Sequence, residues 1–272
     1  MKLKVYADRM SQPSRAVLIF CKVNGIDFEE IKVELLKRQQ FSPELKDSYS
    51  YKEGANSALI IYFDAAISEI NPMGKVPAIL DGKFKLFESH AILIYLACAF
   101  PGVADHWYPN DLFKRAKIHS VLDWHHSNLR FGAAKFVLNT VLGPALGLPL
   151  NPRAAAEAEK LLSVSLQKIE SFWLKGNGRF LLGSNQPSIA DLSLVCEIMQ
   201  LEVLDEKDRL RVLSPHKKVQ QWIENTKTAT RPHFDEVHKI LFKVKENLQK
   251  QQSAGASSET ASSARPTLQS KM

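Results

Sequence analysis

Residues 2–35 read KLKVYADRMSQPSRAVLIFCKVNGIDFEEIKVEL, and the pattern of this stretch indicates two strands that flank one helix. Residues 2–6 alternate polar and apolar side chains and include Val and Tyr, which favours a short strand. Pro13 suits the first turn of a helix, where its missing N–H costs nothing, and Asn24-Gly25 is a typical helix end. Residues 28–35 alternate again and predict the second strand. Because the connection between the strands contains a helix, we expect them to be parallel.

A second group of elements lies between residues 75 and 96. The segment 75–80 (KVPAIL) predicts a strand with a proline near its start, and Asp81-Gly82 is a hairpin turn signal that joins it to a partner strand over 84–87. The next segment, 88–96, has the apolar spacing of a helix. The order of elements is therefore β-α-β followed by β-β-α, which is the order of the thioredoxin-like fold.

From about residue 110 onward the sequence predicts helices, and we find no convincing strand. Apolar residues recur at spacings of three and four, as in amphipathic helices. Ser188-Ile-Ala-Asp191 fits a capping box at a helix start. We therefore expect an α+β protein of two domains, with a thioredoxin-like domain over residues 1–102 and an all-helical domain over residues 109–250.

The end of the chain has a different composition. Residues 251–272 are rich in Gln, Ser and Ala and cannot bury enough apolar surface to fold, so we expect a disordered tail. Its last residues, Ser270, Lys271 and Met272, are similar to the peroxisomal targeting tripeptide, with Met in place of the usual Leu. This pattern predicts binding to the peroxisomal import receptor and a peroxisomal location. A chance match is the alternative, with the cytoplasm or the nucleus as the location.

Composition argues against several classes of protein. The 272 residues carry 36 Lys and Arg against 29 Asp and Glu, but the basic residues are dispersed, which disfavours nucleic-acid binding. No apolar run approaches the roughly 20 residues of a membrane span. The first ten residues lack the apolar block of a secretory signal peptide. Three scattered cysteines form neither a disulfide framework nor a zinc site, which favours a reducing compartment.

Five motifs in order resemble the glutathione S-transferases of the theta class, and plant members in particular. They are Ser11-Gln-Pro-Ser-Arg-Ala16, Asn71-Pro-Met-Gly-Lys-Val-Pro77, Phe87-Glu-Ser-His-Ala-Ile92, Trp107-Tyr-Pro109 and Pro187-Ser-Ile-Ala-Asp191. The resemblance implies a homodimeric detoxification enzyme that conjugates reduced glutathione to hydrophobic electrophiles and reduces organic hydroperoxides. It implies glutathione as co-substrate, with no tightly bound cofactor and no metal.

The resemblance also implies which residues activate the glutathione thiol. Ser11 would donate a hydrogen bond to the thiolate, next to Gln12, and the helix that begins near Pro13 would add the positive end of its dipole. Taken alone, the sequence position of Ser11 favours a simple helix cap. Val76 would pair its backbone with the cysteinyl unit, and Pro77 would be cis; an edge-strand proline is the alternative.

The resemblance implies that different residues bind the two ends of the glutathione tripeptide. Ser89 would bind the γ-glutamyl carboxylate and Glu88 the ammonium group, at a helix start that favours anions. Gln40, Phe41 and Lys75 would lie at the glycyl end. Without the resemblance, a routine helix cap is an equally good interpretation of Glu88 and Ser89, and Lys75 is an ordinary surface lysine.

Three other features can be assessed from their positions in the predicted helices. Cys21 stands well inside the predicted helix, at a spacing typical of a core position, and we expect it to be buried and inert. His125 and His126 are adjacent in a helix and point to different faces, which disfavours a shared metal. Arg130 either lines the electrophile pocket or is solvated.

Residues 47–68 (DSYSYKEGANSALIIYFDAAIS) stand outside the resemblance and look like an insertion. Their second half is apolar and β-prone, an aggregation hazard where exposed, and we assign the segment no core position. Because it adjoins Gln40, Phe41 and Lys75, it predicts weakened or lost glutathione affinity.

The sequence therefore predicts an enzyme, with two alternatives. One is a non-catalytic ligand-binding protein of the same fold whose site is impaired by the insertion. The other is an interaction module, against which the retention of Ser11 and Glu88-Ser89 argues.

Overall fold

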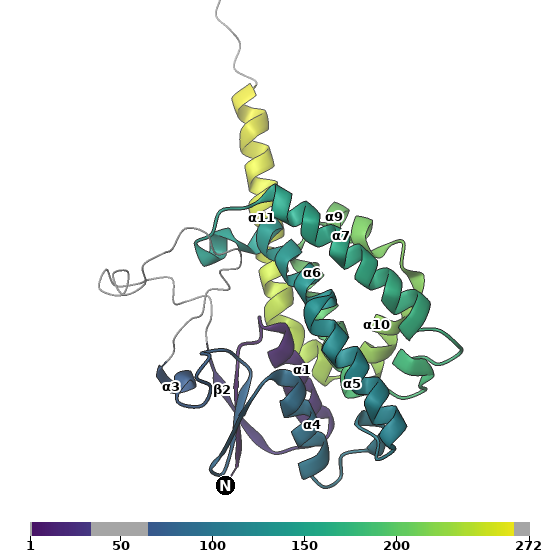
Figure 1. Cartoon of the computed structure of the whole chain (residues 1–272). Helices are drawn as coiled ribbons and strands as arrows, with labels where there is room; N and C mark the ends of the chain where they lie inside the picture. The colour runs from purple at the N-terminus through teal and green to yellow at the C-terminus, as the bar shows by residue number, and fades with distance from the viewer. Residues whose placement is uncertain (1, 34–64, 264–272) are drawn as a thin grey trace, which may run out of the picture.

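The computed structural model describes residues 2–33 and 65–263, and a four-stranded sheet organises the first of its two halves (Figure 1). The strand order is β2-β1-β3-β4, with β1 Leu3–Ala7, β2 Phe28–Lys32, β3 Ala78–Asp81 and β4 Phe84–Phe87. β1 pairs in parallel with β2, and the β1–β3 and β3–β4 pairs are antiparallel. The predicted thioredoxin-like order of elements is confirmed.

Alternation along β1 gives the sheet two apolar faces. Leu3, Val5 and Ala7 enter the large core that the sheet shares with the helices. Tyr6 packs instead against a smaller cluster on the other face, which contains Ile67, Ile70 and Ala78. Successive side chains of a strand point to opposite faces, so one short strand serves both clusters.

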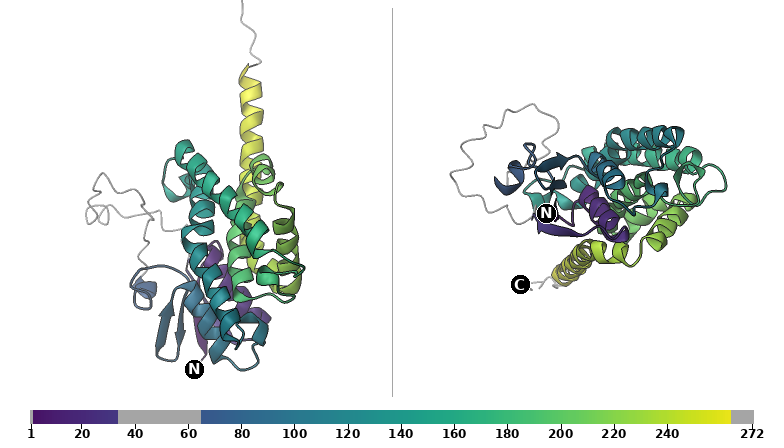
Figure 2. Two further views of the ribbon diagram at one scale, coloured as in Figure 1. Left: turned by 45° about the vertical axis from the view of Figure 1, so that its right-hand side comes forward. Right: turned by 90° about the horizontal axis from the view of Figure 1, so that it is seen from below.

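Three helices cover the sheet. The helices α1 (Gln12–Val23) and α4 (Ser89–Ala99) lie on the face turned toward the second half of the molecule, and α3 (Ala65–Ser68) lies on the other side (Figures 1 and 2). Ile67 of α3 is only 1% exposed. Our expectation that residues 47–68 have no core position is therefore wrong at the C-terminal end of the segment, because Ile67 packs beneath the sheet. Residues 47–64 lie outside the described residues.

Among residues 88–263 the structure contains helices and no strand, as predicted. The α-helices are α5 Leu112–Ser127, α6 Leu129–Val137, α7 Pro152–Lys168, α8 Ile189–Ile198, α9 Glu206–Leu213, α10 Lys217–Ala229 and α11 His233–Ser263. Short 3-10 or π turns are η2 Asp105–Trp107, η3 Leu138–Leu142, η4 Pro144–Leu146, η5 Ile169–Trp173, η6 Leu181–Gly183 and η7 Met199–Val203. All ten residues of α8 are buried, so this helix forms the centre of the second half.

The predicted capping box at the start of α8 is present. The carboxylate of Asp191 accepts hydrogen bonds from the Ser188 backbone N–H and hydroxyl, each at 2.8 Å, and the Ser188 hydroxyl accepts from the Ala190 N–H at 3.2 Å. These bonds satisfy donors that a helix start leaves without intrahelical partners.

Helix α11 corrects one expectation about the tail. We expected disorder from residue 251, but the helix continues to Ser263 and projects beyond the body of the molecule (Figure 1). Its first turns are anchored by the buried residues Phe234, Val237 and Leu241. Once a helix is nucleated, each added residue costs little, so a polar continuation can remain helical. Residues 264–272 lie outside the described part of the chain.

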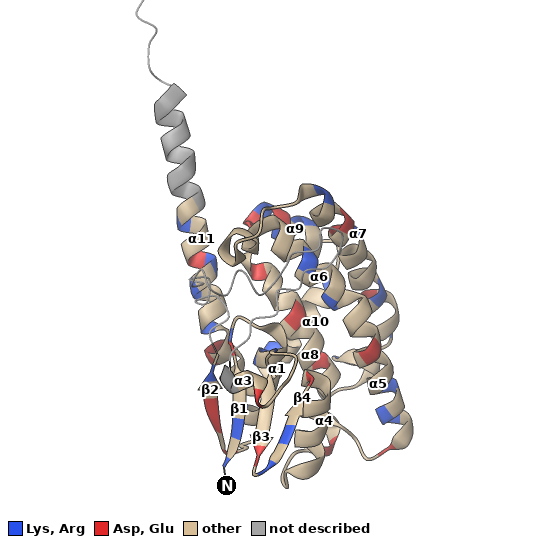
Figure 3. Cartoon of the chain, turned by 60° about the vertical axis from the view of Figure 1, so that its left-hand side comes forward, with Lys and Arg blue, Asp and Glu red and all other residues tan. Residues whose placement is uncertain are grey.

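Charged residues of both signs are interspersed on the described surface (Figure 3). Lys4 of β1 lies 3.9 Å from Glu29 of β2, and Lys2, just before β1, pairs with Asp27 at 2.6 Å. None of the described helices combines the length and apolar content that crossing a bilayer requires.

Candidate functional site

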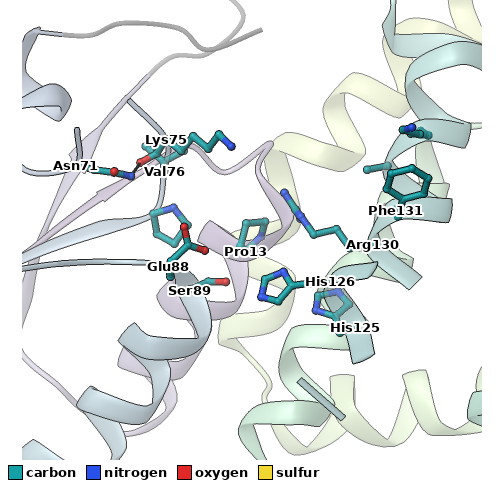
Figure 4. Close-up of a pocket in the computed structure, with 13 residues that line it drawn as sticks. Pro13, Asn71, Lys75, Val76, Glu88, Ser89, His125, His126, Arg130 and Phe131 are labelled. Carbon is teal, nitrogen blue, oxygen red and sulfur yellow. Dashed lines mark hydrogen bonds between the residues drawn. The ribbon is translucent and has the colours of Figure 1, made fainter. Parts of the chain in front are cut away.

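A pocket of about 380 Å³ lies between the two halves of the molecule (Figure 4). On the sheet side it is lined by the start of α1, the loop before β3 and the start of α4, through Pro13, Asn71, Lys75, Val76, Pro77, Glu88 and Ser89. On the helical side it is lined by α5 and α6, through His125, His126, Arg130, Phe131, Ala134 and Lys135. The structure thus brings five predicted site residues, at positions 75, 76, 77, 88 and 89, into one pocket.

Asn71 shapes the loop that carries Val76. This side chain is almost fully buried; its amide N–H donates to the Lys75 carbonyl at 2.7 Å, and its oxygen accepts from the Met73 N–H at 2.9 Å. The Val76–Pro77 peptide bond is cis, as the resemblance implied. The pairing of β3 begins only at Ala78, so none of the described strand pairs uses the backbone N–H and C=O of Val76.

Glu88 and Ser89 stand at the N-terminal end of α4. Glu88 has a φ of 69°, a left-handed conformation that non-glycine residues adopt at a cost and that clusters at functional sites. Its side chain makes no capping hydrogen bond, and Figure 4 shows its carboxylate beside Ser89 in the pocket. The first N–H groups of a helix lack intrahelical acceptors. The pair therefore offers a hydroxyl and helix-start N–H groups for a carboxylate, and one carboxylate for an ammonium group.

Ser11 precedes α1 without capping it. Its backbone is extended, as at a helix N-cap, but its hydroxyl makes no capping hydrogen bond within the described structure. Its N–H donates to the Asp8 carbonyl at 2.9 Å. Pro13 lines the pocket, whereas Ser11 and Gln12 are not among the described lining residues. The hydroxyl is therefore left unused by the helix, two residues from the pocket wall. Gln40 and Phe41 lie outside the described residues.

The helical wall is built on a buried carboxylate, Glu197 of α8. Arg130 Nη1 donates to Glu197 Oε2 at 2.8 Å, and His125 Nε2 lies 3.5 Å from the same oxygen. Burial opposes ionisation, but the charge of Arg130 and the contact with His125 hold the pKa of Glu197 below its ordinary value. The ionised Glu197 thus anchors a guanidinium that is one-third exposed and lines the pocket. Of the two readings of Arg130, the pocket-lining one holds.

His125 and His126 line the pocket, and His90 is buried beside them. His125 Nδ1 lies 3.2 Å from His90 Nε2, and the rings of His90 and His126 are 4.4 Å apart. Burial, reinforced by the neighbouring histidines and Arg130, lowers the pKa of His90 to about 2. Burial also lowers the pKa of His126. Both imidazoles are therefore neutral at pH 7. In the described part of the chain, no group of three His, Cys, Asp or Glu side chains could hold a metal ion.

Comparison with known proteins places this geometry in a family. A family model described as "Glutathione S-transferase, N-terminal domain" matches residues 11–98. Glutathione S-transferase T1 of Arabidopsis thaliana is 70% identical over 272 residues, which cover 100% of both chains. The chain belongs to the theta class of the glutathione S-transferases. Its match to Arabidopsis glutathione S-transferase T3 is 66% identical and covers 100% of this chain but only 41% of that protein.

Solved theta-class structures share the fold of this theta-class chain. Human glutathione transferase theta-2 in complex with glutathione superposes with a TM-score of 0.74 at 32% identity, covering 92% of this chain and 91% of that one. A human theta-class enzyme in complex with the glutathione conjugate of 1-menaphthyl sulfate gives a TM-score of 0.74 at 32% identity, covering 93% and 92%.

Three residues that shape the theta-class pocket of this chain were missed by the sequence analysis. Asn71 and His90 stand inside the motifs, but nothing in their spacing indicates the loop hydrogen bonds or the contact with His125. Glu197 did leave a signal, because it is a carboxylate in the middle of the apolar run of residues 194–198. A charge that cannot reach water needs a partner, and this need predicts a cation such as Arg130 nearby.

The cysteines of this theta-class chain lie within the described residues, and all three are free. Cys21 is buried, as predicted, and burial raises its pKa to about 12. Its thiol therefore stays protonated at neutral pH and is a poor nucleophile.

Proposed function

We propose that this chain is an active glutathione transferase that binds reduced glutathione along the sheet side of the pocket. The observation that carries the proposal is the meeting of Glu88, Ser89 and the Val76 backbone beside the start of α1. Glu88 and Ser89 match the charges of the γ-glutamyl end, and Val76 matches the peptide groups of the cysteinyl unit. Lys75 offers a cation to the glycyl carboxylate. The human theta-2 structure described as a glutathione complex supports this assignment.

The central task of the site is to ionise the glutathione thiol. A free thiol has a pKa near 8.5, so less than about a tenth is thiolate at pH 7. The Ser11 hydroxyl, unused by α1, donates to the sulfur anion, and the N-terminus of α1 adds a favourable dipole. A fall of about two pKa units corresponds to roughly 2.7 kcal/mol and makes the thiolate dominant. No general base is then needed.

The helical wall receives the second substrate. Phe131 and Ala134 supply apolar contacts, and Arg130 supplies a positive charge. In conjugation, the thiolate forms a bond to an electrophilic carbon and the leaving group departs with its electron pair. In hydroperoxide reduction, the thiolate attacks the terminal oxygen, the O–O bond breaks, and the alkoxide leaves with its electron pair and takes up a proton from solvent to become an alcohol. The resulting sulfenic acid then reacts with a second glutathione to give the disulfide and water. Both reactions serve detoxification.

Replacement of Ser11 by alanine tests the proposal. We expect Ser11→Ala to lower kcat/KM by about 10- to 100-fold for a model electrophile and for cumene hydroperoxide, because a hydrogen bond to a charged group contributes about 1.5–3 kcal/mol. The matched control is Ser171→Ala, which removes an exposed hydroxyl that donates to the Gln167 carbonyl at 2.8 Å. Equal rates in the wild type and in Ser11→Ala would remove Ser11 from the mechanism. Retention on a glutathione resin without turnover would favour the non-catalytic binding protein.

The assembly is a proposal of its own. We propose a homodimer, which the theta-class resemblance implies. Light scattering after size-exclusion chromatography checks it, because a dimer has twice the mass of the 30.6 kDa chain. A monomer at micromolar concentration would contradict it.

A further inference from the structure

Arg15 is a fully buried arginine in the first turns of α1, four residues after Ser11. Its Nη1 donates to the carbonyls of Arg9 and Met10, at 3.1 and 3.0 Å. Its Nη2 donates to the carbonyl of Cys196 at 3.0 Å and to Gln200 Oε1 at 2.9 Å. One guanidinium thus joins the turn before Ser11 to α8 and η7 in the helical half.

Burial of a cation is energetically costly, so the presence of an arginine at this core position needs an explanation. An apolar side chain of similar volume fills a core at a lower desolvation cost. Burial lowers the pKa of Arg15 to about 10, which still leaves it protonated at neutral pH. The planar fork of the guanidinium can donate in two directions at once, which an ammonium group cannot do in this fixed geometry. Arginine therefore suits this position because its guanidinium connects the turn before Ser11 to α8 and η7, and not because its side chain fills the core.

The turn that Arg15 holds is the one that places Ser11. Within it, the Ser11 N–H donates to the Asp8 carbonyl at 2.9 Å, and the Met10 N–H donates to Asp8 Oδ1 at 2.7 Å. On the outer side, Arg9 makes a two-pronged contact with Glu30 at 2.8 and 2.6 Å. The inner side rests on Arg15.

We propose that Arg15 is a positioning residue for Ser11 and that Gln200, through Arg15, lets the helical domain set the place of the Ser11 hydroxyl. This inference rests on the proposed function, because it concerns how the thiol-activating serine is held. Gln200 is buried in η7 and is not among the lining residues of the described pocket, so it acts only through Arg15.

The test removes Gln200 Oε1, one of the two acceptors that Arg15 has on the helical side, and leaves the turn itself unchanged. Gln200→Met keeps the length of the side chain without the oxygen, and Gln200→Asn keeps an amide that is withdrawn by one methylene. The matched control is Trp222→Phe, which removes another buried hydrogen bond of the helical half, from Trp222 Nε1 to Asp191 at 2.8 Å. The primary measurement is the pKa of the enzyme-bound glutathione thiol, from thiolate absorbance in the ultraviolet. The melting temperature is recorded alongside.

We expect Gln200→Met to raise the pKa of the bound thiol by about 0.5 to 1 unit, which lowers kcat/KM about three- to tenfold at pH values below that pKa. The loss should recover at alkaline pH, and KM for glutathione should stay within about twofold. Gln200→Asn should shift the thiol pKa in the same direction, and it serves as the test if the methionine variant does not fold. Trp222→Phe should lower the melting temperature and leave the thiol pKa in place.

A Gln200 variant that melts earlier but ionises the thiol like the wild type would overturn the inference and reduce Arg15 to a structural bridge. Ser11→Ala, measured in parallel, separates this failure from that of the proposed function. If Ser11→Ala raises the thiol pKa and the Gln200 variants do not, the result contradicts only the positioning role of Arg15 and Gln200. If Ser11→Ala leaves the thiol pKa unchanged, the proposed role of Ser11 falls and the inference falls with it.

Discussion

His90 and His238 are buried histidines whose imidazoles are neutral in the folded protein. Burial, together with nearby positive charge, lowers the pKa of His90 to about 2 and that of His238 to about 3. His90 lies under the pocket beside His125, and His238 bonds to the Phe234 carbonyl at 2.8 Å in α11. In the unfolded chain both regain an ordinary histidine pKa near 6.5.

This difference predicts a pH-dependent stability. Below about pH 6.5 the unfolded chain binds protons that the folded chain refuses, so the free energy of unfolding is highest above that pH and falls as the pH is lowered. Each histidine contributes up to about 1.4 kcal/mol per pH unit. Urea unfolding between about pH 7 and pH 5 should therefore show a shallower decline for His90→Gln than for the wild type. His238→Gln should have a similar and additive effect, because the residues lie on different helices. Parallel curves for all three proteins would contradict this assignment.

At the scale of elements, the capping box of α8 is more than a local device. Asp191 is completely buried, and besides Ser188 it accepts hydrogen bonds from the Leu181 N–H and from Trp222 Nε1, each at 2.8 Å. Burial raises the pKa of Asp191, although the hydrogen bonds that its carboxylate accepts act in the opposite direction. One carboxylate thus ties α8 to η6 and α10.

We predict that Asp191→Asn destabilises the protein by about 2–4 kcal/mol. An amide of the same shape points an NH₂ group at donors that need an acceptor, and an unsatisfied buried donor costs about 1–3 kcal/mol. Ser188→Ala should cost only about 1 kcal/mol, as for an ordinary cap. Urea denaturation of the three proteins at pH 7 measures both effects. An equal loss in the two variants would show that Asp191 acts only as a cap residue.

The packing of helix α3 determines which part of the predicted insertion can be deleted without damage to the fold. Ile67 packs with Ile70 and Ala78, and its carbonyl accepts from the Asn71 N–H at 2.7 Å, which supports the loop before β3. A deletion that removes Ile67 would damage the fold and the pocket together. Deletion of residues 47–64 spares this support. We expect it to lower KM for glutathione relative to the full chain; an unchanged KM would show that the segment does not disturb the site.

At the scale of the whole molecule, the pocket and the C-terminal end of helix α11 are set apart. The pocket lies between the starts of α1 and α4 on one side and the helices α5 and α6 on the other. Helix α11 ends at Ser263, and its C-terminal part projects away from the body of the molecule (Figure 2). Substitutions in the tail should therefore leave catalysis unaffected.

The predicted peroxisomal location of the chain can be tested with a fluorescent fusion. With Ser270, Lys271 and Met272 at a free carboxyl terminus, we predict that a fluorescent protein fused to the N-terminus becomes peroxisomal, because an import receptor reads these residues. Lys271→Glu should return the fusion to the cytoplasm and nucleus without changing turnover. The same distribution for both fusions would leave the tripeptide without this role.

Local chemistry explains why the sequence predicted the elements so well. The alternation of β1, the Asp81-Gly82 turn and the Ser188 cap depend on neighbours within a few residues, so they can be read before any packing is known. The extent of α11 could not be predicted in this way. Its polar end is helical because the buried first turns have already nucleated the helix.

The sequence by itself determined the class of the protein and the residues on the sheet side of the pocket, because Val76, Glu88 and Ser89 lie in short motifs whose backbone chemistry is local. Only the tertiary structure decided the opposite wall and its supports. Glu197 meets Arg130 across 67 positions, and Arg15 meets Gln200 across 185. Such pairs form because buried charged and polar groups need hydrogen-bond partners when the two halves pack. The spacing of residues along the chain does not indicate which distant residues will pair.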